Sequence, residues 1–182
     1  MKLRIVAGSL RGRYITITGK AARCRPTLAR VREAVANIIR DDLPGATVAD
    51  VCAGTGAMGI EFFSRGAGRV DFVENDKYLV RALYQTLESF GMQQHCRVPA
   101  ADLHKFISAN TSMYDIAWYD PPYDREEYLK ILPQLLHILK QDGILLFERR
   151  RKSMKMDLPD TGIIPCDVRE YGGTIVEMYR KS

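Results

Sequence analysis

The hydrophobic positions of the chain fall into three regions with different spacing. Residues 1–26 hold two short β-branched runs, LRIVA and YITI, on either side of the glycine-containing GSLRGR, which predicts a small β-hairpin. An amphipathic helix is predicted next, with Pro26 and Thr27 at its start and Thr27 as its N-cap. Its apolar stripe comprises Leu28, Val31, Val35, Ile38 and Ile39. We expect residues 1–26 to form a basic extension of a domain that spans residues 27–182.

From residue 47 onward, short apolar runs alternate with longer segments of helical period. This alternation is typical of a parallel β-sheet covered by helices. Strands are predicted at 47–52, 69–74, 96–100, 114–119 and 143–148. Helices are predicted at 57–66, 77–91, 104–110 and 126–139. Gly91 is placed to end the second of these helices, and Pro133 is placed to kink the last.

The spacing changes again after about residue 160, where IIPCDVREYGGTIVEMYR predicts two strands that turn at YGG. The expected architecture is α/β and Rossmann-like: a mostly parallel seven-stranded sheet with a C-terminal antiparallel hairpin, preceded by the small N-terminal β-hairpin and helix. An apolar content of 46% and a charged content of 27% agree with a globular protein of this kind. No apolar run is long enough to cross a bilayer.

The four cysteines and three histidines are scattered without the spacing of metal ligands or of a disulfide framework, so we expect no metal site and a cytoplasmic setting. Positive charge, in contrast, is concentrated. Residues 1–40 hold ten Lys and Arg and one acid, a balance of +9, whereas the rest of the chain holds 17 and 21, a balance of −4. An Arg-rich surface of this kind most often binds nucleic acid, although a solvated basic face gives the same pattern.

A glycine loop follows the first strand of the predicted sheet. DVCAGTGAMG matches GxGxxG between a strand and a helix, and Glu74 ends the next strand, where an acid can hold ribose hydroxyls. The pattern is formed by Gly54, Gly56 and Gly59. NAD, FAD and S-adenosylmethionine all suit it. Asp50, in the approach to the loop, favours S-adenosylmethionine, because a carboxylate attracts its positive charge and repels a pyrophosphate. Asp102 could accept from the adenine amine, cap the helix that follows it, or do both.

The fourth strand of the predicted sheet ends in DPPY, residues 120–123. Because the carboxyl ends of the first and fourth strands face one crevice, Asp120 is expected near the methyl group of bound S-adenosylmethionine. The Asp120 carboxylate and the Pro121 carbonyl would each accept an N–H of an exocyclic base amine and direct its lone pair at the methyl. Pro122 stiffens the segment, and Tyr123 offers a ring on which an extruded base can stack. No general base is expected, since the methylated amine can lose its proton to water or to Asp120.

These motifs, with RIVAGSLRGR, RPTLARVRE, FVENDK and EYGGTIVEMYR, resemble the RsmD family of 16S rRNA guanine-N2 methyltransferases over essentially the whole chain. The resemblance implies methyl transfer from S-adenosylmethionine to the N2 amine of a guanine in 16S rRNA, within a partly or fully assembled small ribosomal subunit. The cofactor-binding residues it implies are Asp50, Gly54, Gly56, Glu74, Asp102 and Thr27. The residues expected at the target guanine are Asp120, Pro121, Pro122 and Tyr123. The residues expected to contact rRNA are Arg4, Arg11, Arg13, Arg25 and Arg30.

Two features depart from the family pattern or add to it. Members often carry an acid between RPT and VRE, where this chain has Leu28 and Ala29, so we assign no role there. The run ERRRK at 148–152 is either an added RNA contact or a solvated cationic loop.

Other functions fit parts of the pattern. DNA adenine-N6 methyltransferases also use DPPY, but the 63 residues between Gly56 and Asp120 and the 34 after Glu148 leave no room for a region that reads DNA sequence. A protein glutamine methyltransferase would leave the basic N-terminus without a purpose. An NAD-dependent oxidoreductase would leave DPPY unexplained, and a non-catalytic RNA-binding module would bind no cofactor. Nothing in the sequence demands an oligomer, and we expect a monomer.

Overall fold

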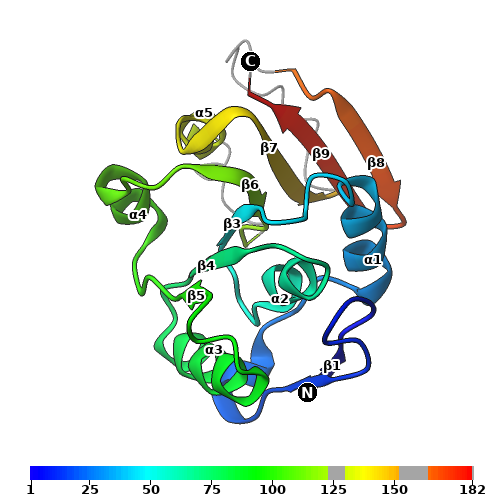
Figure 1. Ribbon diagram of the computed structural model, residues 1–182, viewed down its shortest axis with the longest axis vertical. Coiled ribbons are helices and arrows are strands. Elements are labelled where there is room, and N and C mark those ends of the chain that lie inside the picture. The colour runs from blue at the N-terminus through cyan, green and yellow to red at the C-terminus, as the bar shows by residue number, and fades with distance from the viewer. Residues whose placement is uncertain (123–129, 152–163, 182) are drawn as a thin grey trace.

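The computed structural model describes residues 1–122, 130–151 and 164–181, which form a seven-stranded sheet with helices on both faces and a separate two-stranded hairpin (Figure 1). In the order of the sheet, the first five strands run parallel, the sixth is antiparallel to the fifth, and the seventh is antiparallel to the sixth. In spatial order the strands are β5 (Cys96–Arg97), β4 (Arg69–Val73), β3 (Thr47–Val51), β6 (Tyr114–Tyr119), β7 (Leu139–Arg150), β9 (Thr174–Arg180) and β8 (Asp167–Tyr171). The prediction of a mostly parallel seven-stranded sheet with a C-terminal hairpin is confirmed.

Two hydrophobic clusters lie on the two faces of this sheet. Along β6 the side chains alternate, so that Ile116 and Trp118 belong to one cluster and Ala117 and Tyr119 to the other. The first face is covered by α1 (Ala29–Ile38), α2 (Ala57–Ser64) and α3 (Lys77–Phe90), and the second by α4 (Leu103–Ala109) and α5 (Leu132–His137). Of the helices that the described residues form, none is long and apolar enough to cross a membrane.

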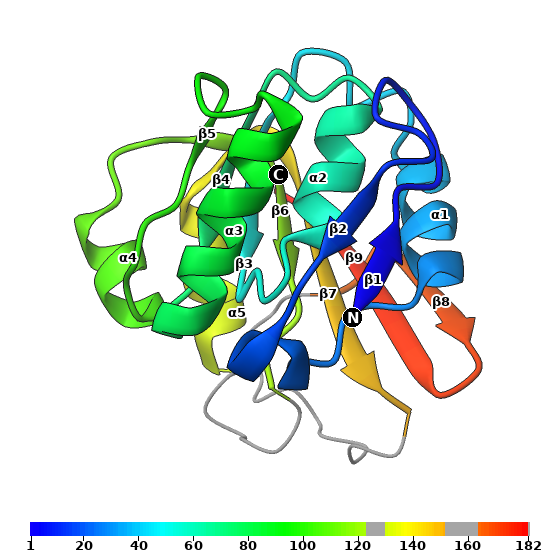
Figure 2. The same ribbon diagram turned by 90° about the horizontal axis from the view of Figure 1, so that it is seen from below.

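The N-terminal hairpin packs on the outside of α2 (Figure 2). It pairs β1 (Lys2–Arg4) with β2 (Tyr14–Thr16) in antiparallel register, as the sequence predicts, and the short 3-10 helix η1 (Gly19–Arg23) follows. Its apolar residues Ile5, Leu10, Ile15 and Ile17 join the same cluster as α2 and α3. The boundary at residue 26 stays a prediction.

The start of α1 differs from the prediction. The helix begins at Ala29, its N-cap position is Leu28, and no side chain caps it. Thr27 therefore does not cap the helix; its hydroxyl bonds to the end of β6 instead. Two members of the predicted apolar stripe, Leu28 and Ile38, are 46% and 38% exposed. The buried members are Val31, Val35 and Ile39.

The other elements differ from the prediction mainly at their ends. The third parallel strand is reduced to the two residues of β5. Pro133 lies in the first turn of α5, where its missing N–H costs no helical hydrogen bond, and it does not kink the interior. The predicted start of that helix at 126–129 lies outside the described residues. Helix α3 begins at the N-cap Asp76 and ends at Gly91, which adopts φ +70° as predicted.

Candidate active site

A pocket of about 700 Å³ opens at the carboxyl ends of the parallel strands. Its wall contains six of the residues predicted to form the site: Gly54, Glu74, Asp102, Asp120, Pro121 and Pro122. A cavity of about 30 Å³ adjoins the same loop and is lined by residues that include Arg25, Thr27, Asp50 and Asp120. The structure thus gathers in one place residues from the glycine loop, the ends of β4 and β6, the start of α4 and the segment before α1.

The glycine loop turns the chain sharply between β3 and α2. Gly54 and Gly56 adopt φ values of +56° and +71°, which residues with a side chain rarely adopt, and Gly56 is the N-cap residue of α2. Gly59 is needed for a different reason. A Cβ on Gly59 would lie 2.5 Å from Phe72 Cε1, so its absence lets α2 pack closely against β4.

Glu74 ties this loop to the end of β4. Its Oε2 accepts a hydrogen bond from the Gly54 amide at 2.8 Å, and its Oε1 accepts from the amides of Asn75 and Asp76 at 2.8 and 2.9 Å. The side chain is 9% exposed and lines the pocket. These bonds fix the carboxylate at the pocket wall, and its two oxygens have further lone pairs that can accept ligand hydroxyls.

Asp50 lies inside β3, as the predicted strand 47–52 implies, and its side chain is only 1% exposed. Its Oδ2 accepts from the Gly59 amide in the first turn of α2 at 2.9 Å. Burial raises the pKa of Asp50 to about 7, with the Gly59 hydrogen bond opposing and the charge of Glu74 adding to the shift. Its Oδ2 is thus directed at the helix backbone and helps to shape the loop, and a contact between Asp50 and a cationic ligand stays a prediction.

Asp102 is the N-cap of α4, one of the two roles left open by its position. Its Oδ1 accepts from the Lys105 amide at 2.9 Å, and the Lys105 ammonium lies 3.7 Å from Oδ2. The backbone hydrogen bond, followed by the charge of Lys105, lowers the pKa of Asp102. An ionised acceptor therefore stands at the pocket wall.

Asp120 stands at the end of β6, where DPPY begins. Its amide donates to the Val51 carbonyl at 3.4 Å, next to the start of the glycine loop. The Thr27 hydroxyl donates to Asp120 Oδ2 at 3.0 Å, although 93 positions separate the two residues. Pro121 is buried and Pro122 exposed, and both line the pocket. Tyr123 lies outside the described residues.

Negative charge dominates around the two pocket thiols, Cys24 and Cys52. The pKa of Cys24 is raised to about 11, first by burial and then by the charges of Glu74 and Asp120. The same causes raise the pKa of Cys52. Both thiols are therefore neutral, and the negative potential favours a ligand that carries positive charge.

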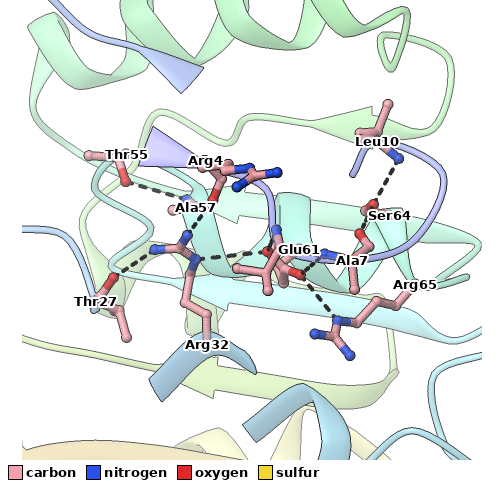
Figure 3. Close-up of polar contacts among 12 residues, drawn as sticks. Arg4, Ala7, Leu10, Thr27, Arg32, Thr55, Ala57, Glu61, Ser64 and Arg65 are labelled. Atoms are coloured by element: carbon pink, nitrogen blue, oxygen red, sulfur yellow. Dashed lines mark hydrogen bonds and ion pairs between the residues drawn. The ribbon is translucent and has the colours of Figure 1, made fainter. Parts of the chain in front are cut away.

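A buried ionic cluster that was not predicted from the sequence lies behind this wall (Figure 3). Arg32, 1% exposed, donates to the carbonyls of Thr27 at 2.8 Å and Arg4 at 2.7 Å, and its Nε lies 4.0 Å from Glu61 Oε2. Glu61, fully buried in α2, also accepts from the amides of Val6 and Ala7, each at 3.0 Å. The available signal was weak: an acid inside the apolar run AMGIEFF.

The predicted RNA-binding arginines are exposed but spread over the molecule. Arg25 lines the small cavity beside Asp120, whereas Arg13 lies over the Phe90 ring and donates to Ser89, at the end of α3 remote from the pocket. Arg30 lies against Gly172 in the β8–β9 turn. Two basic residues that were not singled out, Lys20 and Arg23 of η1, line the main pocket.

Comparison with known proteins agrees with this arrangement. The family model described as Conserved hypothetical protein 95 matches residues 3–180. YlbH of Bacillus subtilis, which is provisionally named an rRNA methyltransferase, is 31% identical over 98% of this chain and 99% of its own length. Ribosomal RNA small subunit methyltransferase D of Escherichia coli K12 is 29% identical over 81% of this chain and 71% of its own.

The fold has close counterparts among solved structures. That of yhhF from Escherichia coli, provisionally named a methyltransferase, superposes with a TM-score of 0.81 and 23% identity over 100% of this chain and 99% of that one. The architecture is that of Rossmann-like S-adenosylmethionine-dependent methyltransferases. With the family match spanning nearly every residue, the chain belongs to the family described as Conserved hypothetical protein 95, the RsmD family of rRNA methyltransferases.

Proposed function

We propose that this protein transfers a methyl group from S-adenosylmethionine to the exocyclic N2 amine of one guanine in 16S rRNA. Family membership and fold support S-adenosylmethionine-dependent methylation of small-subunit rRNA. The observation that carries the finer proposal is the meeting of Asp120 with the glycine loop and Glu74 in one pocket. We further propose that the substrate is a partly or fully assembled small subunit, in which the shape of the RNA presents the base.

Some of the proposed cofactor-binding residues shape the glycine loop, and others would contact the cofactor itself. Asp50 and the glycines shape the loop, because their bonds and dihedral angles fix its path. Glu74 and Asp102 lie at the pocket wall, where they can accept hydrogen bonds from the ribose and the adenine amine of the cofactor. S-adenosylmethionine supplies an electrophilic methyl group on a positively charged sulfur, and the negative charges of Glu74 and Asp120 favour its binding.

Asp120 and the Pro121 carbonyl act on the target amine. The lone pair of an exocyclic amine is delocalised into the base, so the nitrogen is a poor nucleophile. Two acceptors that each take one N–H draw the nitrogen toward tetrahedral geometry and aim its lone pair at the methyl. The nitrogen becomes cationic only as its bond to the methyl carbon forms and the bond between that carbon and sulfur breaks, and its proton would then pass to water or to Asp120. The stacking role proposed for Tyr123 falls outside the described residues.

Basic residues around the pocket fit a phosphate-rich substrate. Lys20 and Arg23 of η1 line the main pocket, and Arg25 lines the adjoining cavity, so three cations border the proposed site. We propose that they contact the backbone on either side of the extruded guanine, while the more distant Arg13 contributes to a wider rRNA contact. No separate sequence-reading element is needed when shape and phosphate contacts position the substrate.

The proposal is tested by transfer of labelled methyl from S-adenosylmethionine to three acceptors: undermethylated small ribosomal subunits, naked 16S rRNA and duplex DNA. The product nucleoside is identified by mass. We expect N2-methylguanosine from at least one of the RNA acceptors. N6-methyladenine from DNA would overturn the substrate assignment, and a protein that binds the cofactor but methylates none of the three would contradict the proposed reaction.

The division of roles within the pocket has its own test. We expect Asp120→Ala to lower turnover far more than cofactor affinity, because Asp120 acts on the amine. We expect Glu74→Ala to weaken cofactor binding more than it lowers turnover at saturating cofactor. Equal effects of each variant on the two constants would contradict this division.

A further inference from the structure

The contact between Thr27 and Asp120 joins the N-terminal segment to the end of β6. Thr27 lies two positions before α1 in non-helical backbone and takes no part in capping that helix. Its hydroxyl instead donates to Asp120 Oδ2 at 3.0 Å. A hydrogen bond to a carboxylate restricts rotation of that carboxylate, and a charge-assisted bond does so more strongly than a neutral one.

The backbone of Thr27 is itself fixed by a hydrogen bond from a buried arginine. Arg32, one helical turn further along the chain, donates to the Thr27 carbonyl and, with its other terminal nitrogen, to the Arg4 carbonyl in β1. The guanidinium is buried, and Glu61 of α2 lies 4.0 Å from its Nε. Arg32, on α1, thus links three other segments: β1, the segment before α1 that carries Thr27, and α2 (Figure 3).

We propose that Thr27 is a positioning residue for the Asp120 carboxylate and not a contact of the cofactor, with the buried Arg32–Glu61 pair holding Thr27 in place. This inference rests on the proposed function, in which Asp120 accepts an N–H of the target amine. Such an acceptor must stand at a fixed angle to the nitrogen, because a small misorientation of a catalytic group costs rate. The Thr27 hydroxyl supplies that constraint by engaging Oδ2.

The test compares two substitutions at one position. Thr27→Val keeps the branched shape and removes the donor, whereas Thr27→Ser keeps the donor. Single-turnover methyl transfer to undermethylated small subunits is measured at saturating S-adenosylmethionine, together with the dissociation constant for the cofactor and the KM for subunits. We expect Thr27→Val to lower the rate about tenfold to a hundredfold with little change in either binding constant, and Thr27→Ser to recover most of that rate.

Thr16→Val is the matched control, because Thr16 is exposed on β2 and does not line the pocket. We expect it to leave the rate unchanged, and thermal unfolding of each variant shows whether the fold is intact. Asp120→Ala is measured in parallel to separate the two proposals. An unchanged rate in Thr27→Val, with Asp120→Ala inactive, would overturn the positioning role and leave the proposed function standing.

Two further outcomes would also overturn the inference. A weaker cofactor affinity in Thr27→Val at an unchanged single-turnover rate would make Thr27 a cofactor contact. Wild-type turnover in Asp120→Ala would refute the proposed role of Asp120 and, with it, any role for Thr27 in orienting that carboxylate.

Discussion

Replacing Glu61 by glutamine is the most informative test of what holds the N-terminal hairpin to the domain. The Glu61 carboxylate is fully buried and accepts three hydrogen bonds: from the Val6 and Ala7 amides at 3.0 Å each and from Arg65 Nε at 3.1 Å. It also faces the buried Arg32 guanidinium at 4.0 Å. A glutamine of the same size cannot reproduce this set, because its NH2 group must take the place of one accepting oxygen.

The magnitude follows from those contacts. Both carboxylate oxygens accept from N–H donors, so the NH2 group of the glutamine faces a donor in either orientation. A buried donor left without a partner costs about 1–3 kcal/mol. The substitution also removes the negative charge beside buried Arg32, and removal of one member of a buried ion pair costs about 3–5 kcal/mol in all. We expect Glu61→Gln to lower the free energy of unfolding by about 3–5 kcal/mol, which corresponds to a fall in Tm of about 6–20 °C for a domain of this size.

Urea unfolding followed by far-UV circular dichroism measures this free energy, and hydrogen exchange shows where the structure loosens. We expect a lower urea midpoint, with faster exchange of the Val6 and Ala7 amides. Glu88→Gln is the matched control, since Glu88 lies exposed on α3 and should change stability by less than about 0.5 kcal/mol. A loss below about 1 kcal/mol for Glu61→Gln would refute the view that this buried carboxylate anchors the hairpin.

Two other changes test the cofactor loop. Gly59→Ala places a Cβ 2.5 Å from Phe72 Cε1 and 2.8 Å from Asp50 Oδ2. We expect it to lower the free energy of unfolding by about 1–3 kcal/mol, measured by thermal unfolding, and to weaken S-adenosylmethionine binding. Gly173→Ala is the control, because a Cβ there meets no atom within 4 Å, and we expect it to change neither quantity. Asp50, whose pKa burial raises to about 7 from 3.8, keeps its proton in the folded protein over a range where the unfolded chain has lost it. The contribution of Asp50 to stability is therefore full below its pKa in the unfolded chain and is lost as the pH rises through its pKa in the folded protein. We expect the urea midpoint of Asp50→Asn to fall less steeply than that of the wild type between about pH 4 and pH 8. Identical pH profiles would contradict the raised pKa.

Much of the fold could be predicted because its signals are local. The apolar run IAWY, residues 116–119, predicted a strand buried on both faces, and Gly91 predicted the end of α3. The glycine loop was recognisable because its left-handed backbone at Gly54 and Gly56 requires that residue type. The rule that ligands bind at the carboxyl ends of parallel strands then brought Asp120 and this loop to one crevice.

The places where the prediction failed are those where a polar side chain found its partner far along the chain. Pro-Thr before an apolar stripe is a valid local signal for a helix start, yet Thr27 bonds Asp120, and the helix begins at Ala29 without a side-chain cap. Asp50 lies in the predicted strand 47–52, but its partner, the Gly59 amide nine positions later, could not be read from the strand pattern.

The order and type of the elements, the glycine loop and the DPPY segment after β6 could thus be identified from the chain alone, because each depends on near neighbours or on backbone preference. Which charged side chains are buried, and which groups they bind, is visible only in the folded structure. Arg32 and Glu61 are residue types that are usually exposed on a helix surface. Only the packing of β1, α1 and α2 around them shows that they lie in the interior, where they support the Thr27–Asp120 contact. Burial and pairing of charge depend on contacts between distant segments, which no local pattern records.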